Sequence, residues 1–405
     1  MRSRRIRGSA AAMVVAGVAF DGCASAWARW RPRVRRTAAI VAARAPVHTY
    51  GRSGPEPPTA VHCCSVPTLA DVARLAGVGV GTASRAISGK GYVDPVTRDR
   101  VLVAARELGY RRNAAARALR ERRSRAVGLL VPDLSNEFYT SAAEVLQAEL
   151  DAAGFQLVVA LTGADPADER HAWETMLDRQ VDGVVHVPVD PAAPLPDGPP
   201  IVQLNRRSRR VSVPAIVSDD ITGVRELTEQ VLAAGHRDIV AIAGPPRLST
   251  TRDRVEGYRR AVRKAGLGEP ADVGRTGPDR ARLISADLTT GGGRDAMHRL
   301  AADPPTAVVA LSSRLLLGAL KACAELGIPI PDELSVVGLG DPEWFAIWRP
   351  SITTFAPPLA EMGREAGKAI LAAISADGAA ERPARPHVLR LPGRLQLRES
   401  IQPPG

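Results

Sequence analysis

Residues 68–87 read TLADVARLAGVGVGTASRAI. Thr68 stands at the N-cap of a predicted helix, where its hydroxyl can accept a hydrogen bond from a free backbone N–H. Four apolar residues then recur at the spacing of one helix face, namely Leu69, Val72, Ala73 and Ala76. Gly77 occupies the position at which a helix commonly ends in a left-handed residue. We predict a second helix over residues 80–87, with Ala83 and Ile87 facing inward.

Two short helices joined by a glycine turn are typical of a helix-turn-helix, in which the second helix enters the major groove of DNA. Such pairs also occur in many all-α proteins, so the pattern alone leaves both interpretations open. The run GVGVGT could be a phosphate-binding glycine loop, but no buried strand precedes it and no lysine follows it. The next residues favour the helix-turn-helix. Asp94 caps a third helix, Pro95 takes its first position, and an apolar stripe closes a three-helix head: Val101, Ala104, Ala105 and Leu108.

Positive charge is concentrated in the first third of the chain. The 405 residues carry a net charge of +11. Residues 1–65 contain 11 arginines and 2 acidic residues, and residues 66–125 contain 13 lysines and arginines against 5 acidic residues. The rest of the chain is therefore net negative. A basic head on a mildly acidic body indicates a polyanionic partner for the head alone.

Residues 1–65 show no apolar periodicity, and we expect them to be disordered. Basic residues, then GSAAAMVVAGVAF, then small residues superficially match a secretory signal. Export would make no sense for a DNA-binding head, so we favour a start codon assigned too early, with the true start near Val61 or Val66. The four cysteines lack metal-ligand spacing, and no apolar run reaches the roughly 18 residues of a membrane span, so we expect a cytoplasmic protein with reduced thiols.

Residues 111–125 form a short, strongly basic connection. Residues 113–119 have a helical composition but are too few to be stable as an isolated helix in water. Such a segment can fold when a partner covers it, and a solvated charged linker is compatible with that behaviour.

From residue 126 onward, buried strands alternate with helices of about 10–15 residues. The predicted strands lie at 126–132, 155–161, 181–189, 200–205, 238–244, 306–311 and 335–340. The predicted helices lie at 136–153, 166–179, 221–234 and 252–265, and we expect the glycines at 291–293 to form a turn before another helix. This alternation is typical of parallel sheets built from βαβ units. About a dozen such elements exceed one ordinary sheet, so we predict two lobes.

Residues 68–398 closely resemble the lactose-repressor (LacI/GalR) family of bacterial transcription regulators. The matching segments, in order, are TLADVARLAGVGVGTASRAISGKGYV, RELGYRRNAAARALR, AVGLLVPDLSNEFY, RDRVEGYRRA, IPDELSVVGLGD and PSITTF. The resemblance implies an all-α helix-turn-helix head at 66–110, a hinge helix and linker at 111–125, and a two-lobed α/β body at 126–405 like that of periplasmic sugar-binding proteins. It also implies a homodimer or higher oligomer on a near-palindromic double-stranded DNA operator.

The resemblance also implies which residues contact DNA. In the head these are Thr68, Val80, Gly81, Thr82, Ser84 and Arg85. Val80 can make only apolar contacts and Gly81 has no side chain with which to read a base, whereas Ser84 and Arg85 can hold phosphates or base edges. In the hinge helix the resemblance implies minor-groove contacts from Asn113, Ala116 and Leu119, with Leu119 as the wedge that kinks the duplex. Gly79 replaces the family's usual cap of the recognition helix, and Arg112 replaces a common proline before the hinge helix.

The resemblance implies a small-molecule effector, a carbohydrate by class, in the cleft between the lobes. The matching positions are Asp133, Asn136, Phe138, Asn205, Arg254, Ser312 and Asp341. Arg254 would offer paired donors to a hydroxyl or carboxylate, and we see no structural reason for an arginine there. Phe138 could equally be a core residue. Trp344 and Trp348 could stack on a sugar ring, or belong to the core or to a dimer contact.

Two departures from the family affect this cleft. An Asn-Asp pair of the family is Ser312-Ser313 here, and a pair of Asp residues is Gly340-Asp341. A sugar site built on bidentate carboxylates has therefore lost acceptors. A smaller, less hydroxylated or differently charged effector is compatible with the sequence, as is a repressor without an inducer.

Two other functions compete with an effector-gated repressor. A periplasmic-type solute-binding protein shares the two-lobed body, but the basic head and the lack of a convincing signal favour the regulator. An enzyme is disfavoured, because the chain has no nucleophile elbow, HExxH or Walker loop, and Asp341, His186 and His236 have no partners at a recognisable spacing. No cofactor or metal is expected. Effector binding should change operator affinity by roughly 1–3 kcal/mol, and effector affinity should change reciprocally.

Overall fold

The computed structural model describes residues 67–89, 91–110, 123–209, 213–272, 280–376 and 388–405. The predictions of a disordered extension at 1–65 and of a hinge helix with Asn113, Ala116 and Leu119 concern residues that lie outside these ranges.

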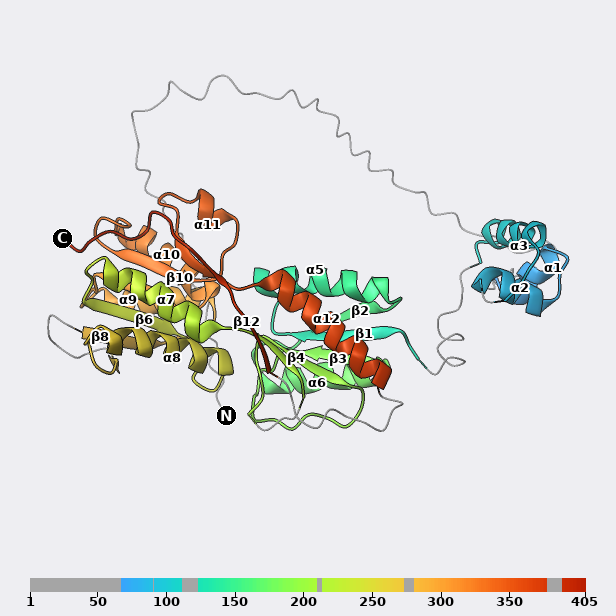
Figure 1. The fold of residues 1–405 in the computed structure, drawn as a ribbon, viewed down its shortest axis with the longest axis horizontal. Helices are drawn as coiled ribbons and strands as arrows, with labels where there is room; N and C mark the ends of the chain where they lie inside the picture. The colour runs from blue at the N-terminus through green and yellow to red at the C-terminus, as the bar shows by residue number, and fades with distance from the viewer. Residues whose placement is uncertain (1–66, 90, 111–122, 210–212, 273–279, 377–387) are drawn as a thin grey trace, which may run out of the picture. The chain divides into compact units, whose positions relative to one another are not determined.

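The head consists of three short helices, α1 (Leu69–Leu75), α2 (Val80–Ser88) and α3 (Pro95–Glu107), shown in blue in Figure 1. Thr68 caps α1 as predicted: its hydroxyl accepts from the backbone N–H of Asp71, whose carboxylate accepts from the Thr68 N–H in return. Gly77 is left-handed, with φ of 63°, and Asp94 caps α3 with Pro95 behind it. All three helices contribute to one small core, made of Val72, Ala73, Ala76, Ala83, Ala86, Val93, Val101 and Ala104.

The body contains two sheets, each forming the centre of one lobe. The N-lobe has the strand order β12-β5-β4-β3-β1-β2, and the C-lobe has the order β13-β11-β10-β9-β6-β8-β7. The N-lobe strands are β1 (Ala126–Val131), β2 (Gln156–Leu161), β3 (Gly183–His186), β4 (Ile201–Leu204), β5 (Ala215–Ser218) and β12 (Val388–Leu391). The C-lobe strands are β6 (Asp238–Ala243), β7 (Ala271–Asp272), β8 (Arg280–Ser285), β9 (Ala307–Ala310), β10 (Ser335–Leu339), β11 (Thr353–Ala356) and β13 (Arg394–Gln396). Among the paired strands described, only β13 runs antiparallel to its neighbour, β11.

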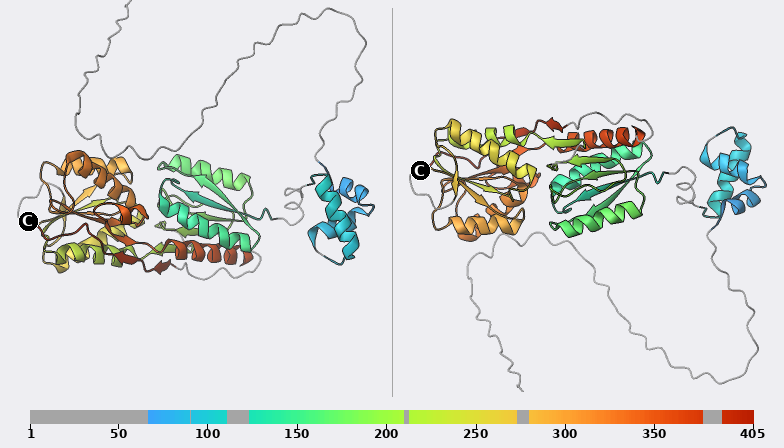
Figure 2. Two further views of the ribbon diagram at one scale, coloured as in Figure 1. Left: turned by 90° about the horizontal axis from the view of Figure 1, so that it is seen from above. Right: turned by 90° about the horizontal axis from the view of Figure 1, so that it is seen from below.

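Helices cover both faces of each sheet (Figure 2). The N-lobe carries α5 (Glu137–Ala152) and α12 (Leu359–Ala376) on one face and α6 (Pro166–Asp178) on the other. The C-lobe carries α7 (Asp220–Ala233) and α8 (Ser249–Lys264) on one face and α9 (Thr290–Leu300) and α10 (Ser313–Leu326) on the other, with the short α11 (Trp344–Ile347) after β10. Within the described ranges, no helix is long and apolar enough to cross a membrane.

The chain passes between the lobes after β5, after β11 and after β12. The N-lobe therefore takes its last helix and an edge strand from the C-terminal part of the chain. Because parallel strands end at one edge of each sheet, these passages bring the loops at the carboxyl ends of both sheets together.

Three predicted elements differ from the structure. The strand predicted at 181–189 is shorter, because β3 covers only Gly183–His186. The helix predicted to begin at residue 252 begins at Ser249, three residues earlier, so Arg254 lies in its second turn. The glycines at 291–293 do not form a turn before a helix but lie inside the first turns of α9. A Cβ on Gly293 would overlap the carbonyl oxygen of Leu315, so close packing of α9 on α10 accounts for glycine in a helix at this position.

Candidate functional site

The outer face of α2 is the part of the head that can meet DNA. Ala83 and Ala86 face the core and Ile87 is half-buried, which leaves Val80, Gly81 and Arg85 exposed and Thr82 and Ser84 half-buried. Val80 is 50% exposed, so its side chain is accessible to a ligand.

Polar groups on this face are free to meet a ligand. The N-cap residue Gly79 makes no side-chain hydrogen bond, so the first N–H groups of α2 have no side-chain acceptor. The Nε of Arg85 donates to the Gly81 carbonyl at 3.3 Å, a bond that holds the exposed guanidinium along the helix. Thr68, by contrast, uses its hydroxyl within the capping box.

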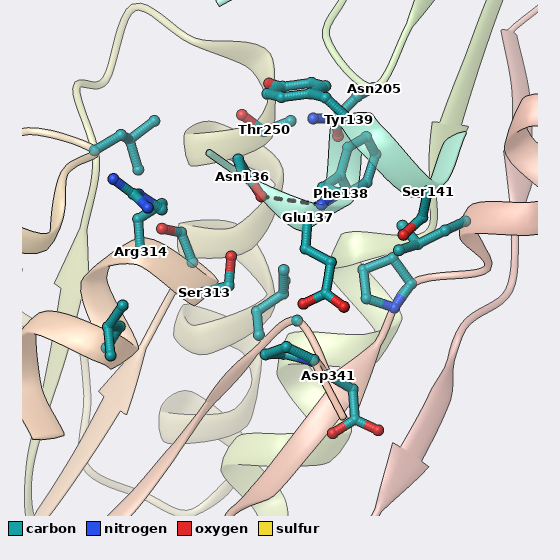
Figure 3. Close-up of a pocket in the computed structure, with 18 of the residues that line it drawn as sticks. Asn136, Glu137, Phe138, Tyr139, Ser141, Asn205, Thr250, Ser313, Arg314 and Asp341 are labelled. Carbon is teal, nitrogen blue, oxygen red and sulfur yellow. Dashed lines mark hydrogen bonds between the residues drawn. The ribbon is translucent and has the colours of Figure 1, made fainter. Parts of the chain in front are cut away.

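A pocket of about 290 Å³ lies between the two lobes of the body. Its walls come from the loop after β1, the end of β4, the first turns of α8 and α10, and the loop after β10. All seven predicted effector residues line it: Asp133, Asn136, Phe138, Asn205, Arg254, Ser312 and Asp341. Figure 3 shows several of them around one space, with Asn136 accepting a hydrogen bond from the N–H of Phe138. Their contact with a ligand remains a prediction.

Asn205 is the residue of this pocket that most clearly lacks a partner. It is 8% exposed, its backbone has a positive φ of 63°, and its side-chain oxygen has no hydrogen-bond partner. An unpaired buried acceptor costs free energy, so a polar ligand in the pocket would remove that cost. Thr250 and Ser312 are also buried at the wall, and Ser312 caps α10 by accepting from the N–H of Leu315.

We expected no structural role for an arginine at position 254, and this expectation was wrong. Arg254 is 7% exposed, and its Nε lies 2.7 Å from the Asp220 carboxylate. One terminal nitrogen donates to the Leu311 carbonyl at 3.0 Å, which leaves the other side of the guanidinium for the pocket. Asp220 and Leu311 therefore hold Arg254 in place, and fewer donors remain than predicted.

Asp341 also differs from the expectation of a group without a partner. Both of its oxygens accept from Arg398, at 2.6 and 2.9 Å, and the Thr354 hydroxyl donates to it at 2.7 Å. Figure 3 shows its carboxylate directed away from Asn136 and Ser313. Asp341 shapes the pocket wall, but its acceptors are occupied within the C-lobe.

His186 and His236 also have partners that the sequence spacing did not reveal. His186 Nε2 lies 2.7 Å from the buried Glu169 carboxylate on α6. His236 contacts Thr306, Ser335 and the Gln402 carbonyl, and burial lowers its pKa. Both belong to the packing of their lobes.

Phe138 packs against the core and also lines the pocket. It is half-buried against the N-lobe core, where it stacks edge-on with Tyr139, and it lines the pocket. Trp344 likewise packs on the C-lobe core and lines the pocket, whereas Trp348 is 40% exposed and does not line it.

Several residues that line the pocket were not predicted from the sequence. They are Glu137, Tyr139, Ser141, Arg206, Thr250 and Arg314 among others. A helix predicted to begin at Ser249 would have placed Thr250 in the first turn of α8, which faces the pocket. Arg206 directly follows Asn205 in an arginine-rich run, and this position was the available signal for it. Glu137 and Arg314 carry no local pattern that distinguishes them from surface residues.

Comparison with known proteins identifies the class. Residues 68–113 match "Bacterial regulatory proteins, lacI family", and residues 228–401 match "Periplasmic binding protein-like domain". The transcriptional regulator CelR of Thermobifida fusca is 33% identical over 351 residues, which cover 82% of this chain and 98% of CelR. The chain belongs to the LacI family. It is a DNA-binding transcription regulator of that family and not an enzyme.

Solved structures of LacI-family proteins have the same fold. A CelR–cellobiose complex is 30% identical, with a TM-score of 0.58 and coverage of 82% of this chain and 99% of that one. The Lac repressor dimer bound to operator and the anti-inducer ONPF is 24% identical, with a TM-score of 0.69 and coverage of 83% and 99%. The predicted fold class is thereby confirmed: a helix-turn-helix head followed by a two-lobed body.

Proposed function

We propose that this LacI-family regulator is a cytoplasmic repressor that binds a near-palindromic operator as a homodimer. When a carbohydrate-like effector fills the pocket between the lobes, it lowers or raises the affinity of the repressor for that operator. The observation that carries the proposal is the polar pocket shared by both lobes. Groups from the N-lobe, such as Asn205, and from the C-lobe, such as Arg254, line one space. A ligand that contacts both lobes changes the free energy of the closed arrangement of the lobes relative to that of the open arrangement.

The nature of the effector is supported by the pocket and by one relative. Buried amide, hydroxyl and guanidinium groups suit a hydroxylated ligand, and Phe138 and Trp344 offer apolar faces for a sugar ring. A LacI-family relative, CelR, has been solved as a complex with the sugar cellobiose. Arg398 occupies the Asp341 carboxylate, and Ser135 and Asn136 occupy one oxygen of Asp133. Glu137 is the acidic residue at the pocket wall whose carboxylate can accept from a hydroxyl of the ligand.

The proposed DNA contacts combine the head with the hinge segment. Val80, Gly81, Thr82, Ser84 and Arg85 present the outer face of α2 to the major groove. Asn113, Ala116 and Leu119 would enter the minor groove, and the domain limits at 66–110, 111–125 and 126–405 follow from this assignment. Lobe movement at the dimer interface would change the spacing of the hinge segments and thereby the operator affinity.

The DNA-binding part is tested by selecting sequences from a random duplex pool with the full chain. We expect a near-palindromic consensus and an affinity that falls steeply with salt, with a log–log slope of about 0.9 per neutralised phosphate. Leu119→Ala should weaken operator binding by roughly 1–3 kcal/mol, the scale of a buried leucine, without changing the melting temperature of the free protein. A large drop in that melting temperature would place Leu119 in an ordinary core and remove the wedge assignment.

The effector part is tested by thermal unfolding and operator binding in the presence of a sugar panel that includes cellobiose. A sugar that raises the melting temperature should also change operator affinity by roughly 5–150-fold. Asn205→Leu should abolish both effects, because it removes the free acceptor and adds an apolar group to the pocket. An unchanged response of this variant would contradict a ligand at this site.

A further inference from the structure

Next to the pocket, the body carries a concentration of arginines that neither the fold nor the neutral-sugar site requires. We define the arginine cluster as Arg207 and Arg209 on the loop after β4, Arg252 in the first turn of α8, and Arg390 on β12. Two lobes contribute to it, because the β4 loop and β12 belong to the N-lobe and α8 to the C-lobe.

Hydrogen bonds show that Arg207 and Arg390 are neighbours, and Arg252 directly precedes on α8 the aspartate that they share. Arg207 donates to both oxygens of Asp253 at 2.9 Å, and Arg390 reaches the same carboxylate at 3.2 Å. Burial, and then the positive charges of Arg209 and Arg207, lower the pKa of Arg252, while Asp253 acts in the opposite direction. Arg252 is close enough to feel both like charges.

Negative charge does not balance this cluster. Asp253 is the one carboxylate that pairs with it among the described residues. Arg252 donates only to the backbone carbonyls of Pro246 and Arg247, and Arg209 makes no side-chain hydrogen bond within the described part of the chain. Like charges this close repel one another, so a bound anion would stabilise the arrangement.

Arg206 connects the cluster to the pocket. It lines the pocket, donates to the Pro188 carbonyl at 3.3 Å, and leaves its buried Nε without a partner. Asn205, 8% exposed with its free side-chain oxygen, precedes it on the same loop. The Nε of Arg207 is likewise buried without a partner, and its backbone N–H is held by the Ser249 hydroxyl beside Thr250 of the pocket wall.

We propose that the effector is a phosphorylated hydroxylated molecule, a sugar phosphate by class, whose body occupies the pocket and whose phosphoryl group binds the arginine cluster. This inference rests on the proposed function and names the chemistry of its ligand. Guanidinium groups match the geometry of phosphate oxygens and form strong charge-assisted hydrogen bonds.

The cluster also suggests how such a ligand acts. The Arg207–Asp253 ion pair joins the N-lobe to the C-lobe. A phosphoryl group on Arg207 competes with Asp253 and replaces a direct link between the lobes by one through the ligand. Binding is thereby coupled to the relative position of the lobes.

The first experiment measures phosphate binding by the full chain, using calorimetry and thermal unfolding. Sodium phosphate is compared with sodium chloride at equal ionic strength, and glucose and fructose are compared with their 6-phosphates. We expect phosphate to raise the melting temperature above the chloride value, and a sugar phosphate to bind more tightly than both its free sugar and phosphate alone. Equal affinity for inorganic phosphate and every sugar phosphate would indicate a free-phosphate site and overturn the sugar-phosphate assignment.

Variants then locate the site. Arg209→Gln combined with Arg252→Gln should weaken phosphate binding roughly tenfold or more, because two charges are lost without breaking an ion pair. Asp253→Asn should tighten it several-fold, since Arg207 and Arg390 lose their competing carboxylate. Arg299→Gln is the matched control: this exposed arginine on α9 lies outside the cluster and, like Arg252, donates to a backbone carbonyl, that of Ser285.

Two further outcomes would overturn the proposal: no effect of phosphate beyond that of chloride on the wild type, or the same phosphate affinity in the wild type and the double variant. The DNA selection with the wild type is independent of both. If the wild type selects an operator while the phosphate experiments fail, this inference falls and the proposed function stands. If phosphate binds but no operator is selected, the proposed function falls instead.

Discussion

At the scale of single residues, Glu169 shows how the N-lobe uses a buried charge. It is 4% exposed, and its carboxylate accepts from the backbone N–H groups of Val189 and Asp190 and lies 2.7 Å from His186 Nε2. Burial raises the pKa of Glu169, but these hydrogen bonds outweigh it, and the pKa lies below its ordinary value. The carboxylate therefore stabilises the fold above its unfolded pKa of roughly 4.3, and this contribution is lost as the pH falls through the folded pKa.

We predict that Glu169→Gln lowers the free energy of unfolding by about 1–3 kcal/mol at pH 7, because an amide cannot accept the same bonds. The difference from the wild type should shrink as the pH falls below about 4. Urea unfolding between pH 7 and pH 3.5 measures it. Glu174→Gln on the same helix is the control, because its side chain is 74% exposed and should change little. A difference that is the same at every pH would mean that the charge of Glu169 does not contribute.

At the scale of elements, the glycines of α9 decide how closely two helices pack. A Cβ on Gly293 would overlap the Leu315 carbonyl, and one on Gly318 of α10 would overlap the Thr290 carbonyl. By contrast, a Cβ on Gly291 would make only an ordinary contact, 3.7 Å from the Thr289 hydroxyl. We predict that Gly293→Ala and Gly318→Ala each destabilise the protein by about 3 kcal/mol, because the backbones must separate.

The matched control is Gly291→Ala, in the same run of three glycines. It should leave the free energy of unfolding unchanged or raise it by about 0.5–1 kcal/mol, since alanine favours a helix over glycine. Thermal unfolding of the three variants beside the wild type decides the matter. Equal effects of Gly291→Ala and Gly293→Ala would refute close packing as the reason for glycine here.

At the scale of the whole molecule, the final segment of the chain completes the C-lobe. After leaving the N-lobe at β12, the chain adds β13 beside β11, and Arg398 pairs with Asp341. Ser400 is fully buried, donates to the Val336 carbonyl at 2.6 Å, and accepts from the Thr353 N–H at 2.9 Å. We predict that deleting residues 394–405 costs roughly 5 kcal/mol or more, because a partly buried carboxylate and several buried groups lose their partners.

That loss is comparable with the total stability of a typical domain, so the truncated chain should lose its cooperative thermal transition or melt far below the wild type. Deletion of residues 403–405 alone is the control, because it retains the hydrogen bonds of Arg398, Ser400 and Gln402. Circular dichroism during heating compares the three chains. A full-length melting temperature for the chain that ends at residue 393 would show that the C-lobe does not depend on this segment.

Local sequence determined the head and the order of elements in the body. Thr68, Gly77 and Asp94 act on backbone groups within four residues, so their effect can be predicted without knowing the rest of the fold. Buried parallel strands likewise appear as short apolar runs, which is why β1, β6 and β9 lie where the sequence predicts them. The positions that line the pocket followed from a family resemblance, which carries information about the tertiary structure that a single sequence lacks.

Tertiary structure decided which hydrogen-bonding groups of the pocket residues remain available to a ligand. Asp341 and Arg254 line the pocket, but Arg398 and Asp220 occupy much of their hydrogen-bonding capacity from distant parts of the chain. The sequence alone predicted a turn at the glycines of α9, because the helix against which they pack, α10, comes later in the chain and leaves no local pattern. The arginine cluster exists only because folding brings the β4 loop, α8 and β12 together. Local interactions depend on neighbours that the sequence displays, whereas charge pairing and packing depend on which distant groups the fold places in contact.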